Sequence, residues 1–243
     1  MASQSPLLQL PRELRDLILG YLFADFQKEN VDFNHNYVGV ERMLTPPYKK
    51  LPAICKVSEQ LYFEATPYFL ARIAPILGNI ETICGVRKWL ATFPCNSGFR
   101  AIRQLAFRNF HGPEQIKGYE LIALCPNLRF LNIMFGDEFA DPGMVSSLSI
   151  KSLSISVNAY ESLDNIILIH QLHKLLQIPK LKRLDFGFHD WRHPMSNERA
   201  RQVKAWLGVK FQGDGKKVHI VCKQMMNIHD LDAGEMCSWQ PYD

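Results

Sequence analysis

Four histidines and one aspartate have the residue types and the spacing that could hold a zinc ion. His170 and His173 stand three positions apart in a segment with helical periodicity, and His189 and His193 bracket Asp190 in a loop after a predicted strand. Imidazole and carboxylate groups are common zinc ligands, so convergence of this helix and this loop would create a metal site. The chain contains no HExxH motif and no cysteine pair beside these histidines. We therefore expect no cofactor, and keep a metal-dependent enzyme as one alternative.

Other patterns of catalytic residues are also missing from the sequence. The chain has no GxSxG, no GxxxxGK[ST] phosphate loop and no GxGxxG. Cys125 follows an apolar segment and precedes Pro126, which indicates a buried thiol. The carboxylates Asp137, Glu138 and Asp141 lie in a loop with Gly and Pro, whereas general acid–base catalysis needs an apolar cleft. The sequence therefore predicts a protein that is not an enzyme.

Length and composition are those of an ordinary folded protein. The chain has 243 residues, of which 47% are hydrophobic and 21% charged, enough for a sizeable core. Its six cysteines form no CxxC pair, which is typical of reduced thiols in an intracellular protein. The N-terminus lacks a signal-peptide pattern, and the apolar runs fall far short of the roughly 20 residues that span a bilayer. We expect a cytoplasmic or nuclear protein without membrane attachment.

A formal charge of +4 permits a nucleic-acid partner without arguing for one. The basic residues nearest to Trp191 and Trp206 are Arg183, Arg192, Arg199, Arg201, Lys204 and Lys210. Val203, Trp206 and Leu207 recur at helical spacing and so predict a core face. The charges are then the solvated side of that helix, and we expect no nucleic-acid partner.

The second half of the chain repeats a six-residue pattern. Each copy has an apolar residue, a Lys or Arg, a variable residue, a Leu, a small or polar residue and another apolar residue. The copies are Ile102-Arg-Gln-Leu-Ala-Phe, Leu128-Arg-Phe-Leu-Asn-Ile, Ile150-Lys-Ser-Leu-Ser-Ile and Leu181-Lys-Arg-Leu-Asp-Phe, with a looser fifth at Val218-His-Ile-Val-Cys222. The first four start 26, 22 and 31 residues apart, and helical patterns lie between them at 119–125, 163–177 and 197–211. One strand plus one helix per repeat is the leucine-rich-repeat arrangement, in which neighbouring units stack into a continuous core.

Alternation along the strands predicts two faces of the sheet. The core face is predicted to hold Leu105, Phe107, Leu131, Ile133, Phe135, Leu153, Ile155, Val157, Leu184, Phe186 and Phe188. The other face is predicted to be solvated and concave, with Ala106, Arg108, Asn132, Met134, Ser154, Ser156, Asp185, Gly187 and His219. We expect a protein substrate to bind through Arg108, Asn132, Met134, Ser154, Ser156, Asp185 and His219. A plain solvated face without a ligand is the alternative.

The first half of the chain is predicted to be helical. Residues 5–23 predict one amphipathic helix with Pro11 in its first turn and an apolar stripe of Leu14, Leu17, Ile18, Tyr21 and Leu22. Residues 24–50 are polar and predict an irregular insertion, and a second helix is expected from Pro52 to about Ala71, broken or restarted by Pro67. A further helix is expected over 86–93.

Two segments of this half resemble an F-box of the kind found in fungal F-box-like proteins. The first is Leu10-Pro-Arg-Glu-Leu-Arg-Asp-Leu-Ile-Leu-Gly-Tyr-Leu22, with its Leu-Pro start, Glu-Leu pair and Tyr-Leu end. The second is Ile54-Cys-Lys-Val-Ser-Glu-Gln-Leu-Tyr-Phe-Glu-Ala65, which is similar to the Cys-x-Val-Ser-x-Gln continuation of such proteins. The resemblance implies docking on the small adaptor subunit of an SCF-type cullin–RING ubiquitin ligase, while the repeats hold the substrate. The adaptor contacts implied by it are Leu10, Pro11, Leu14, Ile18, Leu22, Val57 and Leu61.

The expected protein is thus an α/β chain in which an N-terminal helical F-box-like region precedes a short leucine-rich-repeat-like β/α solenoid. We place the helical region at 1–98 with its insertion at 24–50, the repeats at 99–223 and a C-terminal cap or tail at 224–243. The insertion of about 26 residues departs from a compact F-box, although loop closure grows only slowly more unfavourable with length. The alternative is a ligase-independent scaffold in which Leu14, Ile18 and Leu22 are internal core and the F-box-like helices cap the repeats.

Overall fold

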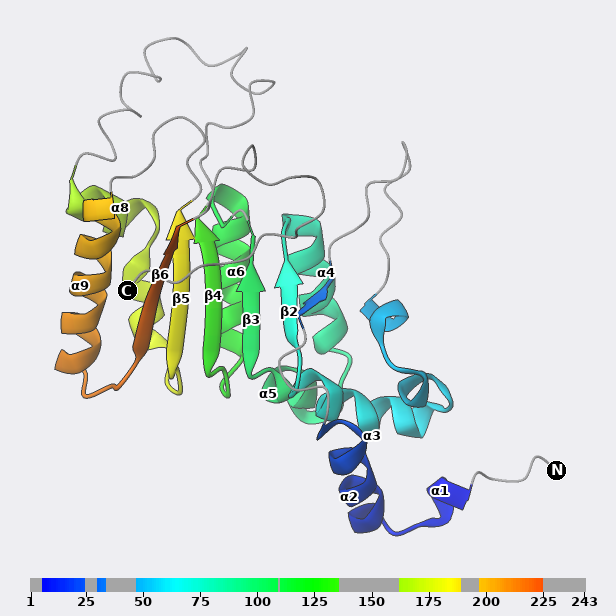
Figure 1. Ribbon diagram of the computed structural model, residues 1–243. Helices are drawn as coiled ribbons and strands as arrows, with labels where there is room; N and C mark the ends of the chain where they lie inside the picture. Colours follow the sequence, from blue (N-terminus) through cyan, green and yellow to red (C-terminus); the bar gives the residue numbers. More distant parts are fainter. Residues whose placement is uncertain are drawn as a thin grey trace, which may run out of the picture.

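A parallel sheet whose strands follow one another in chain order organises the molecule (Figure 1). The computed structural model describes residues 6–24, 30–33, 47–108, 110–135, 162–188 and 197–224. The six strands in this part of the chain are β1 (Asn30–Asp32), β2 (Ala74–Leu77), β3 (Gln104–Phe107), β4 (Phe130–Phe135), β5 (Arg183–Phe188) and β6 (His219–Gln224). The protein is therefore a mixed α/β fold with a parallel sheet, as the strand–helix periodicity predicts.

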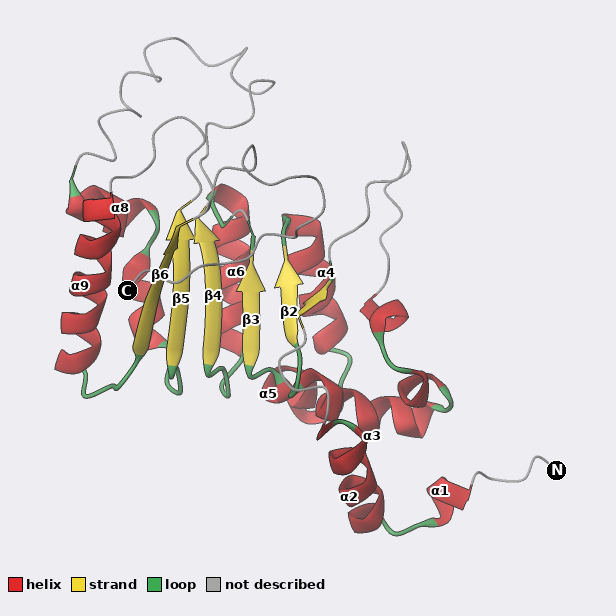
Figure 2. Ribbon diagram, viewed as in Figure 1, coloured by secondary structure: helices red, strands yellow, loops and turns green. Residues whose placement is uncertain are grey.

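Helices connect the strands and lie behind the sheet in the view of Figure 2. The connecting helices are α4 (Ile80–Leu90), α6 (Gly112–Leu124), α8 (Leu163–Ile169) with the 3-10 helix η6 (Leu172–Gln177), and α9 (Asn197–Gly213). Parallel crossovers are nearly always right-handed, and when strand order follows chain order this puts every crossover helix on one side. The other side carries no helix among the described residues, and we call it the open face.

The core lies between the sheet and these helices. One hydrophobic cluster runs from Leu19 near the N-terminus to Cys222 in β6. The predicted core-facing residues of the strands are confirmed where they are described, because each is at most 2% exposed: Leu105, Phe107, Leu131, Ile133, Phe135, Leu184 and Phe186. Leu153, Ile155 and Val157 lie outside the described residues, as does the side chain of Phe188.

Two strands precede the predicted repeats. β1 lies within the segment predicted to be an irregular insertion, and β2 follows the second predicted helix. Residues 1–98 therefore contribute β1, β2 and α4 to the same β/α stack as the repeats. The predicted strand at Ile150 lies outside the described residues. Strands β4 and β5 pair directly with each other over six residues.

The N-terminal helices differ in detail from the prediction. The predicted single helix over 5–23 is two helices, α1 (Pro6–Gln9) and α2 (Arg12–Leu22), and Pro11 is the N-cap of α2 rather than part of its first turn. The second predicted helix is likewise split into the 3-10 helix η3 (Ala53–Lys56) and α3 (Glu59–Leu70), because Ser58 caps α3 by accepting from the Leu61 amide at 3.1 Å. Short helices η2 (Pro47–Lys50), η4 (Pro94–Asn96) and α5 (Ser97–Ala101) complete this region.

Two further helix predictions need correction. Pro67 does not break α3, which continues to Leu70, and the Ala71 amide bonds to the Pro67 carbonyl at 3.0 Å. The helix predicted over 163–177 ends at Ile169, because Gln171 adopts a left-handed conformation with φ 48° before η6 begins. Within the described ranges, none of the helices has both the length and the apolar character needed to cross a membrane.

Candidate functional site

Helix α2 is attached to the rest of the protein through a single face. Leu19 and Phe23 are at most 1% exposed and belong to the core cluster. Beside them, Arg15 forms a buried, two-pronged ion pair with Glu64 of α3: its Nε and Nη2 donate to the two carboxylate oxygens at 2.8 and 2.7 Å. The Gln60 side chain donates to the same carboxylate at 3.1 Å. A fork of this kind fixes the rotation of α2 about its axis as well as its position.

The ion pair also determines the charge state of Glu64. The hydrogen bond from Arg15 lowers the pKa of the Glu64 carboxyl, and the bond from Gln60 acts in the same direction against the effect of burial. The same hydrogen bond raises the pKa of Arg15. Both groups are therefore charged near neutral pH, and the attachment of α2 depends on that charge.

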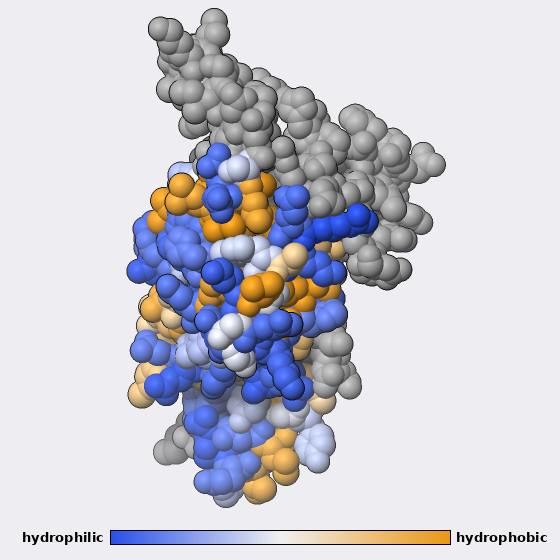
Figure 3. All heavy atoms as spheres, turned by 90° about the vertical axis from the view of Figure 1, so that its left-hand side faces the viewer, coloured by the Kyte–Doolittle hydropathy of each residue, from blue (hydrophilic) through white to orange (hydrophobic). Residues whose placement is uncertain are grey.

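The opposite face of α2 is apolar and exposed. The α2 stripe, as we call it, consists of residues with exposed fractions between 41% and 74%: Leu14, Leu17, Ile18, Tyr21 and Leu22. Figure 3 shows apolar atoms at the lower end of the molecule, the end at which α2 lies in Figure 1. Large apolar side chains grouped on one face of a helix are characteristic of an interaction site. The interpretation of Leu14, Ile18 and Leu22 as internal core is therefore wrong.

The remaining predicted adaptor contacts are divided between surface and core. Val57 is 63% exposed, Pro11 is exposed and Leu10 is half-buried. Leu61 is only 1% exposed, because it lies on the side of α3 that faces the core, so it supports this region from inside and presents no surface to a partner. The exposed members of the predicted adaptor set are thus Leu14, Ile18 and Leu22 of the α2 stripe, together with Pro11 and Val57.

The open face of the sheet is less solvated than its pattern predicts. Arg108 and His219 are exposed and Asn132 is half-buried, as expected of a binding face. Ala106, Met134 and Asp185 are 8%, 3% and 8% exposed, and Gly187 is buried as well. For Ala106 the reason is a short side chain between neighbours in adjacent strands, and Asp185 is covered by its own ion pair. Ser154 and Ser156 lie outside the described residues.

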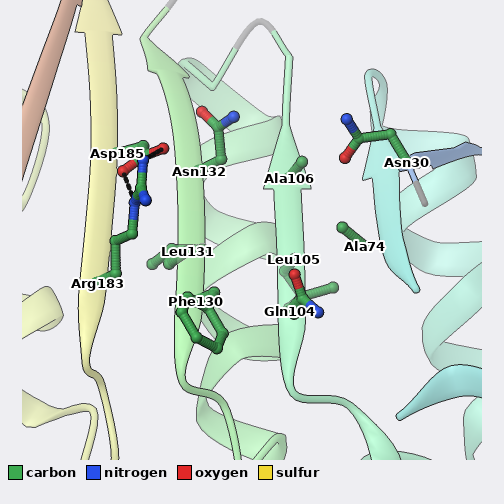
Figure 4. A pocket seen from close by; sticks show the side chains of 10 residues that line it. All are labelled: Asn30, Ala74, Gln104, Leu105, Ala106, Phe130, Leu131, Asn132, Arg183 and Asp185. Carbon is green, nitrogen blue, oxygen red and sulfur yellow. Dashed lines mark hydrogen bonds and ion pairs between the residues drawn. The ribbon is translucent and has the colours of Figure 1, made fainter. Parts of the chain in front are cut away.

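A hollow with a volume of about 250 Å³ lies on this face (Figure 4). Its floor is formed by Ala74 and Ala106, whose small side chains leave space between larger neighbours. The side chains around it include Asn30, Gln104, Phe130, Asn132, Arg183 and Asp185. Phe130 is 39% exposed, so the hollow also has an aromatic wall.

The polar groups of the hollow differ in whether they are already paired. Arg183 donates to Asp185 through Nε at 2.7 Å and Nη2 at 3.1 Å, which raises the pKa of Arg183. The amide side chains of Asn30, Gln104 and Asn132 have no hydrogen bond to any other described residue. These amides can therefore both donate to and accept from a ligand.

Of the residues that line this hollow, the sequence prediction placed Ala106, Asn132 and Asp185 on this face and named only Asn132 and Asp185 as binding residues. It missed Gln104, Phe130 and Arg183, although all three occupy the variable third position of the repeat. The third position of the repeat lies on the same face of the strand as Asn132 and Asp185. Its variability from repeat to repeat was the sequence feature that could have identified it as part of a binding surface. Arg108 lies further along the open face and forms an exposed ion pair with Asp32 of β1 at 3.1 Å.

The histidines do not form a ligand set within the described residues. His170 is 2% exposed at the end of α8, whereas His173 is exposed in η6 beyond the left-handed Gln171. Burial lowers the pKa of His170 to about 4, with His111 adding to the shift. His189, Asp190 and His193 lie outside the described residues, as do the carboxylates Asp137, Glu138 and Asp141. The part of the chain that the structure describes contains no group of three or more potential metal ligands.

No model of a known protein family matches the chain, and neither a curated protein nor a solved structure matches it. The α2 stripe and the hollow on the open face are therefore identified as candidate sites from geometry and chemistry alone.

Proposed function

We propose that the protein is a non-catalytic interaction module: an F-box-type substrate receptor that joins a target protein to an SCF-type cullin–RING ubiquitin ligase. In this proposal the N-terminal helices are F-box-like and the β/α stack is leucine-rich-repeat-like. The α2 stripe docks on the adaptor subunit, and the open face holds the target. The ubiquitin-transfer chemistry belongs to the partner proteins.

The observation that carries the proposal is the orientation of α2. A surface helix normally turns its apolar side inward. Here the inward side holds Arg15, Leu19 and Phe23, while the five apolar residues of the stripe point outward. An amphipathic helix that lays its apolar face into a partner's groove is an established mode of recognition, with anchors at i, i+3, i+4 and i+7. Leu14, Leu17, Ile18 and Tyr21 have this spacing.

The test is capture of the adaptor. The full chain is co-expressed with the cullin–RING adaptor subunit, and the complex is measured by affinity purification and by a titration that gives Kd. We expect a stable complex, and we expect Leu14→Asp/Ile18→Asp to weaken it by at least about 100-fold, since central apolar anchors dominate such interfaces. The variant should keep the unfolding midpoint of the unmodified chain, because both side chains are exposed.

A matched control separates the stripe from general surface effects. Ile116→Asp/Leu124→Asp alters two apolar residues of α6 that are 49% and 42% exposed, close to the exposures of Ile18 and Leu14. We expect this variant to bind the adaptor as the unmodified chain does. Failure of the unmodified, folded chain to bind the adaptor would refute the ligase proposal and leave a ligase-independent scaffold.

A further inference from the structure

Cations line the end of the sheet at which the strands begin. Arg103, Arg129 and Lys182 each stand immediately before a strand, and backbone bonds of 2.8 Å from Arg129 to Arg103 and from Lys182 to Arg129 hold them side by side. Adjacent strands lie about 4.8 Å apart, so the three form a continuous row. We call this row the basic edge.

The charge of the basic edge is not neutralised by any residue in the described part of the chain. Arg103 and Lys182 are exposed, Arg129 is half-buried, and none of the three has an ion pair with any described residue. The turns that enter β3 to β6 contain one acidic residue, Asp214, and add further exposed cations at Arg100, Lys180 and Lys217. Lys180 donates to the Asn127 side chain at 2.7 Å, which positions its ammonium group without cancelling its charge. Such a row attracts a ligand with several negative charges.

The residues of the basic edge directly precede residues that line the hollow. Gln104, Phe130 and Arg183, which line the hollow, are the next residues after Arg103, Arg129 and Lys182. The volume of about 250 Å³ lies below the roughly 300–1,000 Å³ of small-molecule sites and suits one amino-acid side chain. The unpaired amides of Asn30, Gln104 and Asn132 match the donors and acceptors of a peptide backbone.

We propose that the open face binds an extended acidic peptide segment of a partner protein. One uncharged side chain of the segment occupies the floor at Ala74 and Ala106, its peptide groups bond to the amides, and its carboxylates lie along the basic edge. The row of cations spans two strand spacings, about 10 Å, which an extended chain covers in about three residues. A run of three or four residues rich in Asp and Glu therefore matches it. The inference rests on the part of the proposed function that assigns target binding to the open face, and it does not depend on the α2 stripe.

The experiment begins with selection from a phage-displayed library of random dodecapeptides on the purified full chain. We expect enriched peptides to carry at least three acidic residues within four positions next to an uncharged residue. The affinity of the most enriched peptide is then measured by fluorescence anisotropy at low and high salt. Its Kd should rise with salt, because exposed charges are screened.

Two variants test the two halves of the site. We expect Arg103→Glu/Arg129→Glu/Lys182→Glu to raise Kd at least tenfold and Gln104→Ala/Asn132→Ala to raise it about three- to tenfold. The matched control, Lys50→Glu/Lys88→Glu/Arg201→Glu, makes the same change in net charge at exposed cations elsewhere and should leave Kd within about twofold. Unfolding midpoints of all three variants show whether the fold is retained.

Several results would overturn the proposal. They are enrichment of neutral or basic peptides, no enrichment at all, or a charge-reversal variant that binds the peptide as tightly as the control variant does. Displacement of the peptide by a single-stranded dodecanucleotide that binds more tightly would assign the basic edge to nucleic acid instead. Adaptor capture is measured on the same preparation, so loss of peptide binding with intact adaptor capture refutes this inference alone, and the reverse refutes only the ligase proposal.

Discussion

Helices α2 and α9 place their apolar residues on opposite sides. In α9, Val203, Leu207 and Phe211 are at most 1% exposed and pack into the core, while Arg201 lies on the solvated side. In α2, the Arg15 guanidinium is buried beside Leu19, while the five apolar residues of the α2 stripe face outward. Helix α9 is thus part of the helical layer of the β/α stack. Helix α2 packs on the protein through the face that carries Arg15 and Leu19, and its apolar stripe faces the exterior.

The difference shows that an apolar stripe by itself does not identify core. The orientation of α2 depends on which of its two faces packs against α3. The inward face contributes Leu19, Phe23 and Arg15, whose buried guanidinium is paired with the Glu64 carboxylate. Removing Glu64 would leave that guanidinium buried without its carboxylate partner. The outward stripe then remains exposed, and the proposed function assigns it to the contact with the adaptor.

Truncating one leucine in each of the two helices should give the largest difference in stability. We expect Leu207→Ala to lower the free energy of unfolding by about 2–5 kcal/mol, because it opens a cavity in the core. Leu14→Ala, at a residue 46% exposed, should lower it by less than about 1 kcal/mol. Urea titration of the two variants measures both values. Equal losses would mean that α2 buries its stripe against the protein.

Acid should weaken the stack through His170. Burial holds the pKa of His170 at about 4 in the folded protein, against about 6.5 in the unfolded chain. The unfolded chain therefore binds a proton that the folded chain does not, and stability is lost as pH falls from about 6.5 to about 4. The loss amounts to about 3 kcal/mol at the acidic end.

Denaturant titrations across this pH range measure the loss. His170→Leu should remove most of the dependence, and His173→Leu, at the exposed neighbour, should retain it. A His170→Leu variant as acid-sensitive as the unmodified chain would contradict the assignment.

The attachment of α2 should weaken over a lower pH range than the one in which the His170 effect develops. The Arg15 hydrogen bond depresses the pKa of Glu64 below its usual 4.5, so the stabilisation is complete above about pH 4.5 and is lost as pH falls through the lower folded value. We expect the α2 amides to lose protection from hydrogen exchange there before those of β4 do. Glu64→Gln should expose the α2 amides at neutral pH, while Glu59→Gln, at an exposed position of the same helix, should not.

The strands that could be predicted from sequence are those that repeat. β3, β4 and β5 alternate apolar and polar residues at matching positions, and the same pattern four times over identified them. β2 is four buried residues containing Pro75, without alternation, and β1 is three residues in a polar segment. Their place in the sheet depends on pairing with distant neighbours, which no local pattern records.

The candidate surfaces were predictable to a similar extent. The α2 stripe is visible in the spacing of its residues, but its exposure depends on the pairing of Arg15 with Glu64, 49 positions away. The hollow joins Asn30 of β1 and Ala74 of β2 to the variable slots of three repeats. Because β1 and β2 were not predicted from the sequence, the hollow could not be predicted either.

The finest comparison is between two exposed apolar residues of similar accessibility. Leu17 of α2 is 56% exposed and Val209 of α9 is 68% exposed. We expect Leu17→Ser and Val209→Ser each to change the free energy of unfolding by no more than about 0.5 kcal/mol, because neither side chain fills the core. If the α2 stripe is a docking surface, Leu17→Ser alone should raise the Kd for the adaptor, by about threefold to tenfold. Equal Kd values for the two variants would show that exposure of the stripe is no more functional than the scattered apolar residues of any protein surface.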